Sequence, residues 1–371
     1  MKLDKNIGAF LELIRAGLWE KEARLSNFEK IDYMGGLSLA EEQSVVGLVT
    51  AGLEHVVDVK VPQEMLLQFI GQSLQLEKEN GAMNKFVAGL VEKMRNAGIF
   101  ALLVKGQGIA QCYEKPLWRC PGDVDFFLSE DNYQKAKDFL IPMASRVEEE
   151  YAREKHLGMT IDGYAVELHG RLYCGLSSRI EKELDGVYQD TFYGGSVRSW
   201  DDHRVQIFLL SAENDAFYVF THILQHFYKE GVGLRQICDW CRLLWTYREK
   251  LNRGLLESRI RKAGLMSEWK AFGAFAVEYL GMDAEAMPLY SPNKKWKRMA
   301  DKIWSFVLEV GNFGHNRDKS YSKNPYVIRK AFSLSRRIGD LWRHARIFPL
   351  DSMRFLPYMV YNGVRSALRG E

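Results

Sequence analysis

Apolar residues return at three- and four-residue intervals through most of the first 97 positions, which is the period of an amphipathic helix. This period predicts a helix over Gln63–Leu76, with Pro62 in its first turn, where the missing N–H is harmless. It predicts another helix over Met83–Ala97, which ends at Gly98. We therefore expect residues 1–82 to form an N-terminal helical region.

The period changes after Gly98, where short apolar and alternating segments begin to mix with helical ones. Four segments have the pattern of strands: Ile99–Val104, Asp123–Leu128, His156–Ile161 and Tyr164–His169. Asp162-Gly163 separates the last two and suits a tight hairpin turn with positive φ. Helices are expected between the strands, over Ile109–Tyr113 and Asp131–Met143. The middle of the chain is therefore predicted to be mixed α and β.

A loop-like stretch at Gly194–Asp202 precedes renewed helical periodicity, which continues from about Ser211 to the end of the chain. The expected fold class is therefore α+β, with a mixed β-sheet core. We place that core at residues 83–200, between the helical region 1–82 and a C-terminal helical region at 201–371.

The composition is that of a globular protein, with 371 residues, 47% of them hydrophobic and 27% charged. The formal net charge of +3 argues against a protein that coats nucleic acid. The five cysteines are too few and odd in number for a secreted disulfide framework. The N-terminus lacks the apolar core of a signal peptide, and no apolar run reaches the ~20 residues that cross a bilayer. A cytoplasmic protein without a transmembrane segment is expected.

The last 55 residues depart from this balance, because 317–371 holds twelve Lys or Arg against four acidic residues. Aromatic residues are interleaved with the basic ones, a pattern that suits an anionic partner such as RNA, a nucleotide or a membrane surface. An amphipathic helix at Arg329–Arg346 that packs its apolar face and leaves its arginines in water explains the same pattern. The sequence leaves both interpretations open.

Three carboxylates are the most informative candidates for chemistry. Asp123 and Asp125 are two apart in a predicted strand, so their side chains share one face. Glu167 lies in the second arm of the hairpin and joins them if that arm neighbours their strand. Such like charges repel unless cations neutralise them, and hard oxygen ligands suit Mg²⁺. We therefore predict a magnesium cluster, with two ions expected.

A second candidate is the turn Lys105-Gly106-Gln107-Gly108 after the first strand. Its glycines let backbone N–H groups approach an anion, and a helix is expected to follow. Lys105 and Arg119 could add positive charge to bound phosphates. A phosphate turn with a metal cluster favours in-line attack on the α-phosphorus of an NTP, with pyrophosphate leaving.

The segments Ala97–Leu128 and Ala165–Leu172 together resemble the uncharacterised nucleotidyltransferase family of the DNA polymerase beta-like superfamily. Weaker similarity extends to Phe10–Trp19 and His222–Trp240. The resemblance implies a nucleotidyltransferase-type sheet and an NTP substrate. It also implies roles for individual residues: Lys105 and Gly106 in the nucleotide-phosphate turn, Asp123 and Asp125 as metal ligands, Glu167 as the third carboxylate, and Arg119 as a phosphate or substrate contact.

Two positions depart from the superfamily pattern, and a third is open to two interpretations. Gln107 follows Gly106 where serine or glycine is usual, and it could crowd the phosphate. Glu167 replaces the commoner aspartate, and its longer reach could change its role from metal ligand to general base. His169 shares the strand face of Glu167 and either supports the site from behind its ligands or makes a structural hydrogen bond.

Three further spacings are better explained by packing than by chemistry. His222 and His226 are one helical turn apart, but neither a third ligand nor an adjacent glutamate completes a zinc motif. Cys238 and Cys241 have C-x-x-C spacing within an expected helix at 234–247, so buried small residues are favoured over redox or zinc chemistry. Arg235 and Asp239 have the i, i+4 spacing of an ordinary helix pair.

The expected activity is Mg²⁺-dependent transfer of a nucleoside monophosphate from an NTP to a hydroxyl or phosphate acceptor by a two-metal in-line mechanism. The acceptor could be a small molecule, a tRNA or a protein. The alternative is a non-catalytic nucleotide- or RNA-binding module that retains the nucleotidyltransferase fold.

Overall fold

The computed structural model describes the chain except for residues 1–4, 29, 230, 313–338, 340–341 and 370–371. The N-terminal helices are α1 (Lys5–Trp19), α2 (Tyr33–Glu42), α3 (Val46–Glu54) and α4 (Gln63–Asn96). The helices that follow strand β7 are α8 (Ala212–Lys229), α9 (Leu234–Thr246), α10 (Arg253–Ala263), α11 (Met266–Glu278), α12 (Lys294–Val310) and α14 (Pro349–Arg369). Helices therefore precede and follow the strands, although β7 lies within the region 201–371 that was expected to be helical.

A seven-stranded mixed sheet forms the centre of the molecule, in the order β3-β4-β5-β2-β1-β7-β6. Its strands are β1 (Ala101–Val104), β2 (Val124–Leu128), β3 (Arg146–Val147), β4 (His156–Ile161), β5 (Tyr164–His169), β6 (Val197–Asp202) and β7 (Val205–Leu210). The short elements between them are α5 (Gly106–Ala110), η1 (Pro116–Trp118), α6 (Glu130–Leu140), η2 (Ile141–Met143) and α7 (Ser178–Phe192). The predicted α+β class with a mixed sheet is confirmed.

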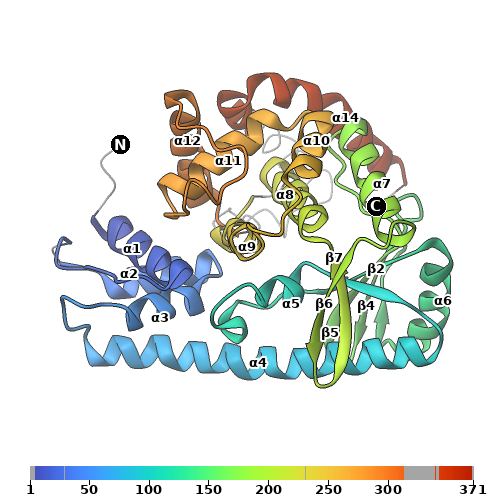
Figure 1. The fold of residues 1–371 in the computed structure, drawn as a ribbon, viewed down its shortest axis with the longest axis horizontal. Helices are drawn as coiled ribbons and strands as arrows, with labels where there is room; N and C mark the ends of the chain where they lie inside the picture. The colour runs from blue at the N-terminus through green and yellow to red at the C-terminus, as the bar shows by residue number, and fades with distance from the viewer. Residues whose placement is uncertain (1–4, 29, 230, 313–338, 340–341, 370–371) are drawn as a thin grey trace.

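The two faces of the sheet are buried by different helices. One face packs with α4 and α6 in a core that includes Val124, Phe126 and Leu168. Phe127 belongs to the other core, which contains residues of α7 and α8. Figure 1 shows α4 running under both the N-terminal helices and the sheet, while α8 to α12 lie above. Because side chains alternate along a strand, Asp125 shares the α8 face with Phe127.

Helix α4 corrects the expectation of two helices with a break near residue 82. It is continuous for 34 residues, so the expected boundary after residue 82 lies inside it. Its middle is rich in Glu, Lys and Gln, which are good helix formers. Gly71 and Gly81 do not break it, and a Cβ at either would meet no atom within 4 Å. The polar stretch between the two expected helices is therefore helix as well, without a continuous apolar face.

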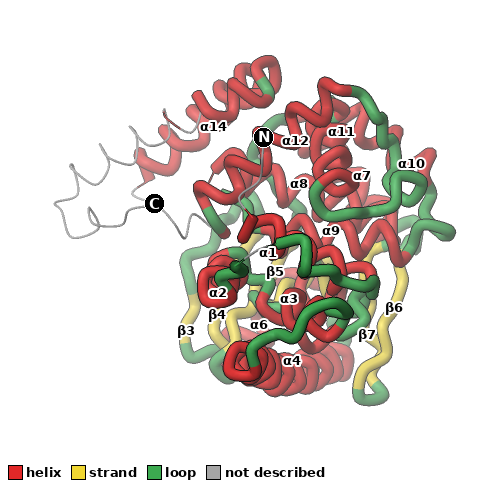
Figure 2. Tube along the Cα trace, turned by 90° about the vertical axis from the view of Figure 1, so that its left-hand side faces the viewer, coloured by secondary structure: helices red, strands yellow, loops and turns green. Residues whose placement is uncertain are grey.

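Strand β6 corrects the loop expected at Gly194–Asp202. Val197–Asp202 pairs antiparallel with β7 and forms an edge of the sheet, opposite the β3 edge (Figure 2). Every second residue of β6 is exposed, so the strand carries few apolar side chains. His203 and Arg204 close the hairpin with φ of 48° and 66°. The weak apolar pattern of this edge strand explains why the sequence reading missed it.

Other local predictions agree with the structure. The β4–β5 hairpin turns at Asp162 and Gly163, with φ of 50° and 84°, as a tight turn requires. Most of the helix expected at Arg329–Arg346, with much of the basic segment, lies outside the described residues. Within the described part of the chain, no helix has the length and apolar character needed to cross a bilayer.

Candidate active site

The Lys105-Gly106 turn leads from β1 into α5 and lies beside the start of β2. Lys105 has φ of 57°, which is uncommon outside glycine, and Gly106 has φ of 40°. A Cβ added to Gly106 would lie 3.3 Å from the carbonyl oxygen of Asp123, tighter than an ordinary contact. Glycine therefore lets the turn come close to the backbone of β2 at Asp123.

Both aspartates line a cleft of about 340 Å³, together with Lys105 and Gly106. Asp123 is exposed, whereas Asp125 is only 5% exposed. The ammonium of Lys105 lies 2.7 Å from Oδ1 of Asp125. Burial alone would lower the pKa of Lys105, but the charge of Asp125 outweighs it and raises the pKa above its usual value. Lys105 is therefore held as a cation against the buried aspartate.

Asp123 carries the electrostatic signature of a carboxylate cluster. Burial raises its pKa, and the negative charges of Glu167 and Asp125 raise it further. A divalent cation would relieve this repulsion, and oxygen ligands from aspartates suit Mg²⁺. The pair therefore fits the metal that the sequence analysis expects at this position.

Glu167 reaches the same sheet face, because β5 runs parallel to β2 with Glu167 opposite Asp125. Its carboxylate is turned toward two histidines, with Oε2 3.2 Å from Nε2 of His156 and 3.4 Å from Nε2 of His169. Burial opposes ionisation, but these histidines lower the pKa of Glu167 below its usual value. The described residues that line the cleft do not include Glu167. Its negative charge acts on Asp123, while its oxygens face the histidines.

His169 connects Glu167 to Asp125. Its Nε2 lies 2.9 Å from Oδ1 of Asp125. Burial lowers the pKa of His169, yet hydrogen bonds to Asp125 and Glu167 outweigh it and raise the pKa above its usual value. His169 therefore hydrogen bonds directly to Asp125, a candidate metal ligand, which agrees with a role in supporting the site.

The sequence model of a family described as Uncharacterised nucleotidyltransferase matches residues 30–281 of this chain. The chain belongs to this nucleotidyltransferase family. The match contains the turn, both aspartates and Glu167, and it excludes the basic C-terminal segment.

One solved structure is similar, that of an antigenic nucleotidyltransferase-like protein from Paracoccidioides brasiliensis, at 12% identity. The similarity covers 50% of this chain and 90% of that one, with a TM-score of 0.31. Among curated proteins, no relative matches the chain.

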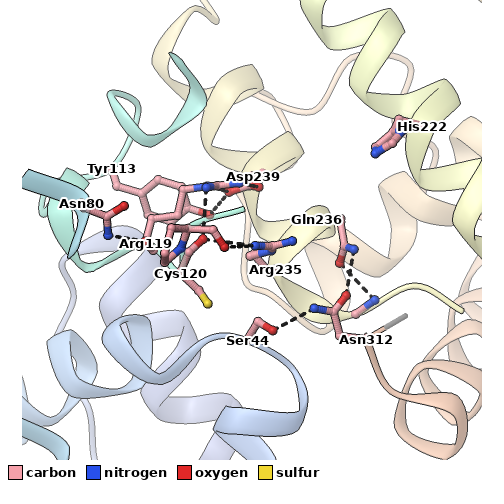
Figure 3. A network of polar contacts seen from close by, with 12 residues as sticks. Ser44, Asn80, Tyr113, Arg119, Cys120, His222, Arg235, Gln236, Asp239 and Asn312 are labelled. Atoms are coloured by element: carbon pink, nitrogen blue, oxygen red, sulfur yellow. Dashed lines mark hydrogen bonds and ion pairs between the residues drawn. The ribbon is translucent and has the colours of Figure 1, made fainter. Parts of the chain in front are cut away.

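Arg119 lines the cleft, but its guanidinium is paired with a carboxylate of the protein (Figure 3). Its guanidinium donates two hydrogen bonds to the carboxylate of Asp239 in α9, at 2.9 and 2.8 Å. Asp239 also accepts a hydrogen bond from the Tyr113 hydroxyl at 2.9 Å. Both Arg119 and Asp239 are buried. Arg119 lies at the wall of the cleft, but its donors are directed to Asp239, so the structure gives it a packing role.

The helix pair expected between Arg235 and Asp239 is not the main contact of either residue. The guanidinium of Arg235 donates to the carbonyl oxygens of Cys120 and Pro121, at 3.2 and 2.8 Å. Burial lowers the pKa of Arg235, as does the nearby charge of Arg119. Arg235 lines the cleft and joins α9 to the loop that precedes β2 (Figure 3). It places positive charge where the sequence analysis had expected that of Arg119.

Gln107 does not face the cleft with its side chain. Its amide nitrogen donates to the side-chain oxygens of Asn80 and Asn84 in α4, at 3.0 and 2.7 Å. The side chain is 3% exposed, and Gln107 is not among the described residues that line the cleft. The expected crowding of the phosphate by Gln107 is therefore wrong. The side chain instead joins the start of α5 to α4.

The structure adds cleft residues that sequence reasoning missed. His222 of α8 lines the cleft, 3.0 Å from His226 between the Nε2 atoms. Burial lowers the pKa of His222 well below its usual value, and the charge of Lys105 adds to the effect. The sequence analysis noted its one-turn spacing from His226 but assigned the pair to packing, whereas the structure places His222 at the cleft.

At another part of the cleft, Asn312 donates to Ser44 at 2.8 Å and accepts from Gln236 at the same distance (Figure 3). These three residues come from separate parts of the chain, and no sequence spacing relates them.

Cys238 and Cys241 are fully buried free cysteines, as the packing interpretation predicted.

Proposed function

We propose that this protein transfers a nucleoside monophosphate from an NTP to a hydroxyl or phosphate group of an acceptor. The observation that carries the proposal is the cleft in which Asp123 and Asp125 lie beside the Lys105-Gly106 turn. A pair of carboxylates beside a turn that can bind phosphates is the arrangement that nucleotidyl transfer requires. Membership of a nucleotidyltransferase family supports the same reaction class.

Asp123 and Asp125 would hold Mg²⁺, which would supply the positive charge that a triphosphate and its pyrophosphate leaving group need. Glu167 would be the third carboxylate of this cluster, since its charge already acts on Asp123. His156 and His169 would keep it ionised and oriented, because the Nε2 atoms of both lie within 3.4 Å of its carboxylate and lower its pKa.

The residues of the turn would bind the phosphates. The backbone N–H groups of Gly106 and Gln107 belong to the first turn of α5, where a helix lacks internal acceptors. Lys105 and Arg235 both line the cleft and would place positive charge near the phosphate oxygens. These contacts would orient the α-phosphorus for in-line attack.

The acceptor would enter the same cleft and face His222. The lowered pKa of His222 keeps its ring neutral at pH 7, so one ring nitrogen can accept a hydrogen bond from an acceptor hydroxyl. Glu167 is a weaker candidate for general base than the sequence analysis expected, because its lowered pKa disfavours protonation. His222 would therefore orient the attacking group.

The test is incubation of the full-length protein with each α-³²P-labelled NTP, Mg²⁺ and fractionated cell extract. Covalent label on an acceptor, with release of pyrophosphate, is the expected result. Asp123→Asn and Asp125→Asn should each lower the rate by at least about 100-fold, because each removes charge from the metal cluster. Asp138→Asn, at an exposed position on α6, is the matched control and should retain the activity.

Two results would contradict the proposal. If both aspartate variants label an acceptor as fast as the wild type, Asp123 and Asp125 are not the catalytic carboxylates. If NTP binds with an affinity that depends on Asp123 while no acceptor is labelled in any extract fraction, the protein is a non-catalytic nucleotide-binding module.

A further inference from the structure

Two histidines and a glutamate gather on one sheet face next to the proposed catalytic aspartates. His156 of β4 lies directly opposite His169 of β5 in the antiparallel register. Glu167 precedes His169 by two residues, so its side chain shares the same face. Asp125 of β2 is opposite Glu167. The three strands therefore place the four side chains in neighbouring positions.

The spacing of the donor atoms is close to that of a metal site. Oε2 of Glu167 lies 3.2 Å from Nε2 of His156 and 3.4 Å from Nε2 of His169. One ligand atom from each of the three residues lies within 4.8 Å of the others. Ligands bound to Zn²⁺ at about 2.1 Å in a tetrahedron are about 3.4 Å apart. Both short distances are close to that separation, but the His156 and His169 rings are stacked, so they would have to tilt for both Nε2 atoms to point at one ion.

Asp125 lies beside this cluster and hydrogen bonds to one of its histidines. Its Oδ1 lies 2.9 Å from Nε2 of His169, on the side away from His156 in strand order. Lys105 contacts the same Oδ1 at 2.7 Å, so Asp125 lies between this cluster and the Lys105-Gly106 turn.

Nε2 of His156 also points to a ligand, because its 3.2 Å contact with Oε2 of Glu167 does not have hydrogen-bond geometry. This atom is inaccessible to solvent and has no hydrogen-bond partner in the described structure, although Glu167 is nearby. Buried polar atoms are normally satisfied, so an unsatisfied one calls for an explanation. Its ring is stacked on His169, with ring centres 4.8 Å apart, and on Tyr151 at 5.9 Å. Stacking on both rings fixes the direction in which Nε2 points.

The donor types select the class of ion. Mg²⁺ prefers oxygen ligands and keeps several waters, whereas imidazole nitrogen suits Zn²⁺ and related first-row transition ions. We propose that His156, Glu167 and His169 form a transition-metal site of the Zn²⁺ class, with the fourth position open to water. The site lies next to the Asp123–Asp125 magnesium position and shares Glu167 with the proposed carboxylate cluster. It goes beyond the proposed reaction, because it requires the donor geometry and not nucleotidyl transfer.

Cobalt is the best probe, because four-coordinate Co²⁺ absorbs visible light much more strongly than the six-coordinate ion. The full-length protein, stripped with a chelator and dialysed, is titrated with Co²⁺ alone and then with competing Zn²⁺. The expected result is about one Co²⁺ per chain, with intense visible bands that Zn²⁺ abolishes. Zinc content by elemental analysis gives the stoichiometry a second time.

His156→Gln is the decisive variant, since it removes one nitrogen ligand and leaves the Asp125 contacts in place. It should weaken Co²⁺ affinity at least 10- to 100-fold, roughly the loss that removal of an outer partner alone causes. Glu167→Gln, of similar shape, should weaken it as well. The matched control is His203→Gln, because His203 also pairs with a carboxylate, that of Asp202, but lies in the β6–β7 turn. This control should bind Co²⁺ like the wild type.

The outcomes separate this site from the proposed function. Asp123→Asn should retain the cobalt spectrum even though it abolishes transfer, because Asp123 is not a ligand of the histidine site. The proposal is overturned if the wild-type protein gives no intense cobalt spectrum. It is equally overturned if His156→Gln keeps the wild-type spectrum, or if Asp123→Asn loses it while His156→Gln does not. The cobalt titration measures metal binding alone, so its result does not depend on the identity of an acceptor.

Discussion

The buried pair of Arg119 and Asp239 leads to the sharpest prediction, because the sequence and the structure give Arg119 different roles. Arg119→Met keeps much of the side-chain volume and removes the charge. Asp239 would then be left buried, with the Tyr113 hydroxyl as its remaining hydrogen-bond donor among those described here. Both partners are less than 10% exposed, at 9% and 4%. Removing one member of such a pair costs about 3–5 kcal/mol of the free energy of unfolding.

The chain offers a control with the same geometry and a different environment. Arg171 donates two hydrogen bonds to Asp185, both at 3.0 Å, but the side chains of this pair are 31% and 51% exposed. Exposed ion pairs contribute about 0–1 kcal/mol, so Arg171→Met should change stability by no more than that. The difference between the two variants therefore measures the effect of burial.

The assay is urea denaturation followed by circular dichroism and tryptophan fluorescence, with NTP affinity measured on the same variants. We expect Arg119→Met to unfold at clearly lower urea than Arg171→Met. The double variant Arg119→Met/Asp239→Leu should recover much of the loss, because no charge is then left unpaired. If Arg119→Met is as stable as Arg171→Met but binds NTP more weakly, Arg119 is a phosphate contact and the packing role is wrong.

Three further predictions concern the turn and a buried acid. Gly106→Ala should lower the free energy of unfolding by about 1–2 kcal/mol and slow transfer, because the φ of 40° and the 3.3 Å approach to Asp123 leave little room for a side chain. Gly71→Ala in α4 is the control and should raise the free energy of unfolding by about 0.5–1 kcal/mol. Urea denaturation compares the two variants. Gln107→Ala should lower the free energy of unfolding by about 1–3 kcal/mol, because it leaves the side-chain oxygens of two asparagines in α4 without their donor. NTP affinity, measured by calorimetry, should not change. A weaker affinity would contradict the position of the Gln107 side chain away from the cleft. Burial, with the charge of Asp351, raises the pKa of Glu268 from its ordinary 4.5 to about 8, so the folded chain keeps a proton that the unfolded chain releases. Stability should therefore fall by up to about 1.4 kcal/mol per pH unit between about pH 4.5 and 8, and Glu268→Gln should flatten this slope in thermal melts; an unchanged slope would contradict the assignment.

Local signals in the sequence were enough to predict most of the elements that position the site. The apolar run before Lys105, the Asp-x-Asp strand and the Asp162-Gly163 turn each correspond to an observed element. Strand alternation also predicted that Asp123 and Asp125 would lie together, and both line the cleft. These signals work because strand periodicity and turn conformation depend on residues that are close in sequence.

Elements with weak local signals were mispredicted. The polar middle of α4 and the edge strand β6 bury little apolar surface of their own, so their patterns resemble a linker and a loop. Contacts with distant elements determine both, since α4 packs on the sheet and β6 pairs with β7. Their secondary structure is a consequence of tertiary packing.

The partners of the polar side chains were decided by tertiary structure alone. The sequence by itself determined which residues carry charge near the Lys105-Gly106 turn, and which alternate on a strand. It could not determine that Arg119 pairs with a carboxylate 120 residues away, or that His156 meets Glu167 across a strand pair. An arginine in an exposed turn is free to bind phosphate, whereas a buried arginine beside a carboxylate is held by that carboxylate. Burial arises only when segments far apart in the chain pack together, and that information is spread over the whole sequence.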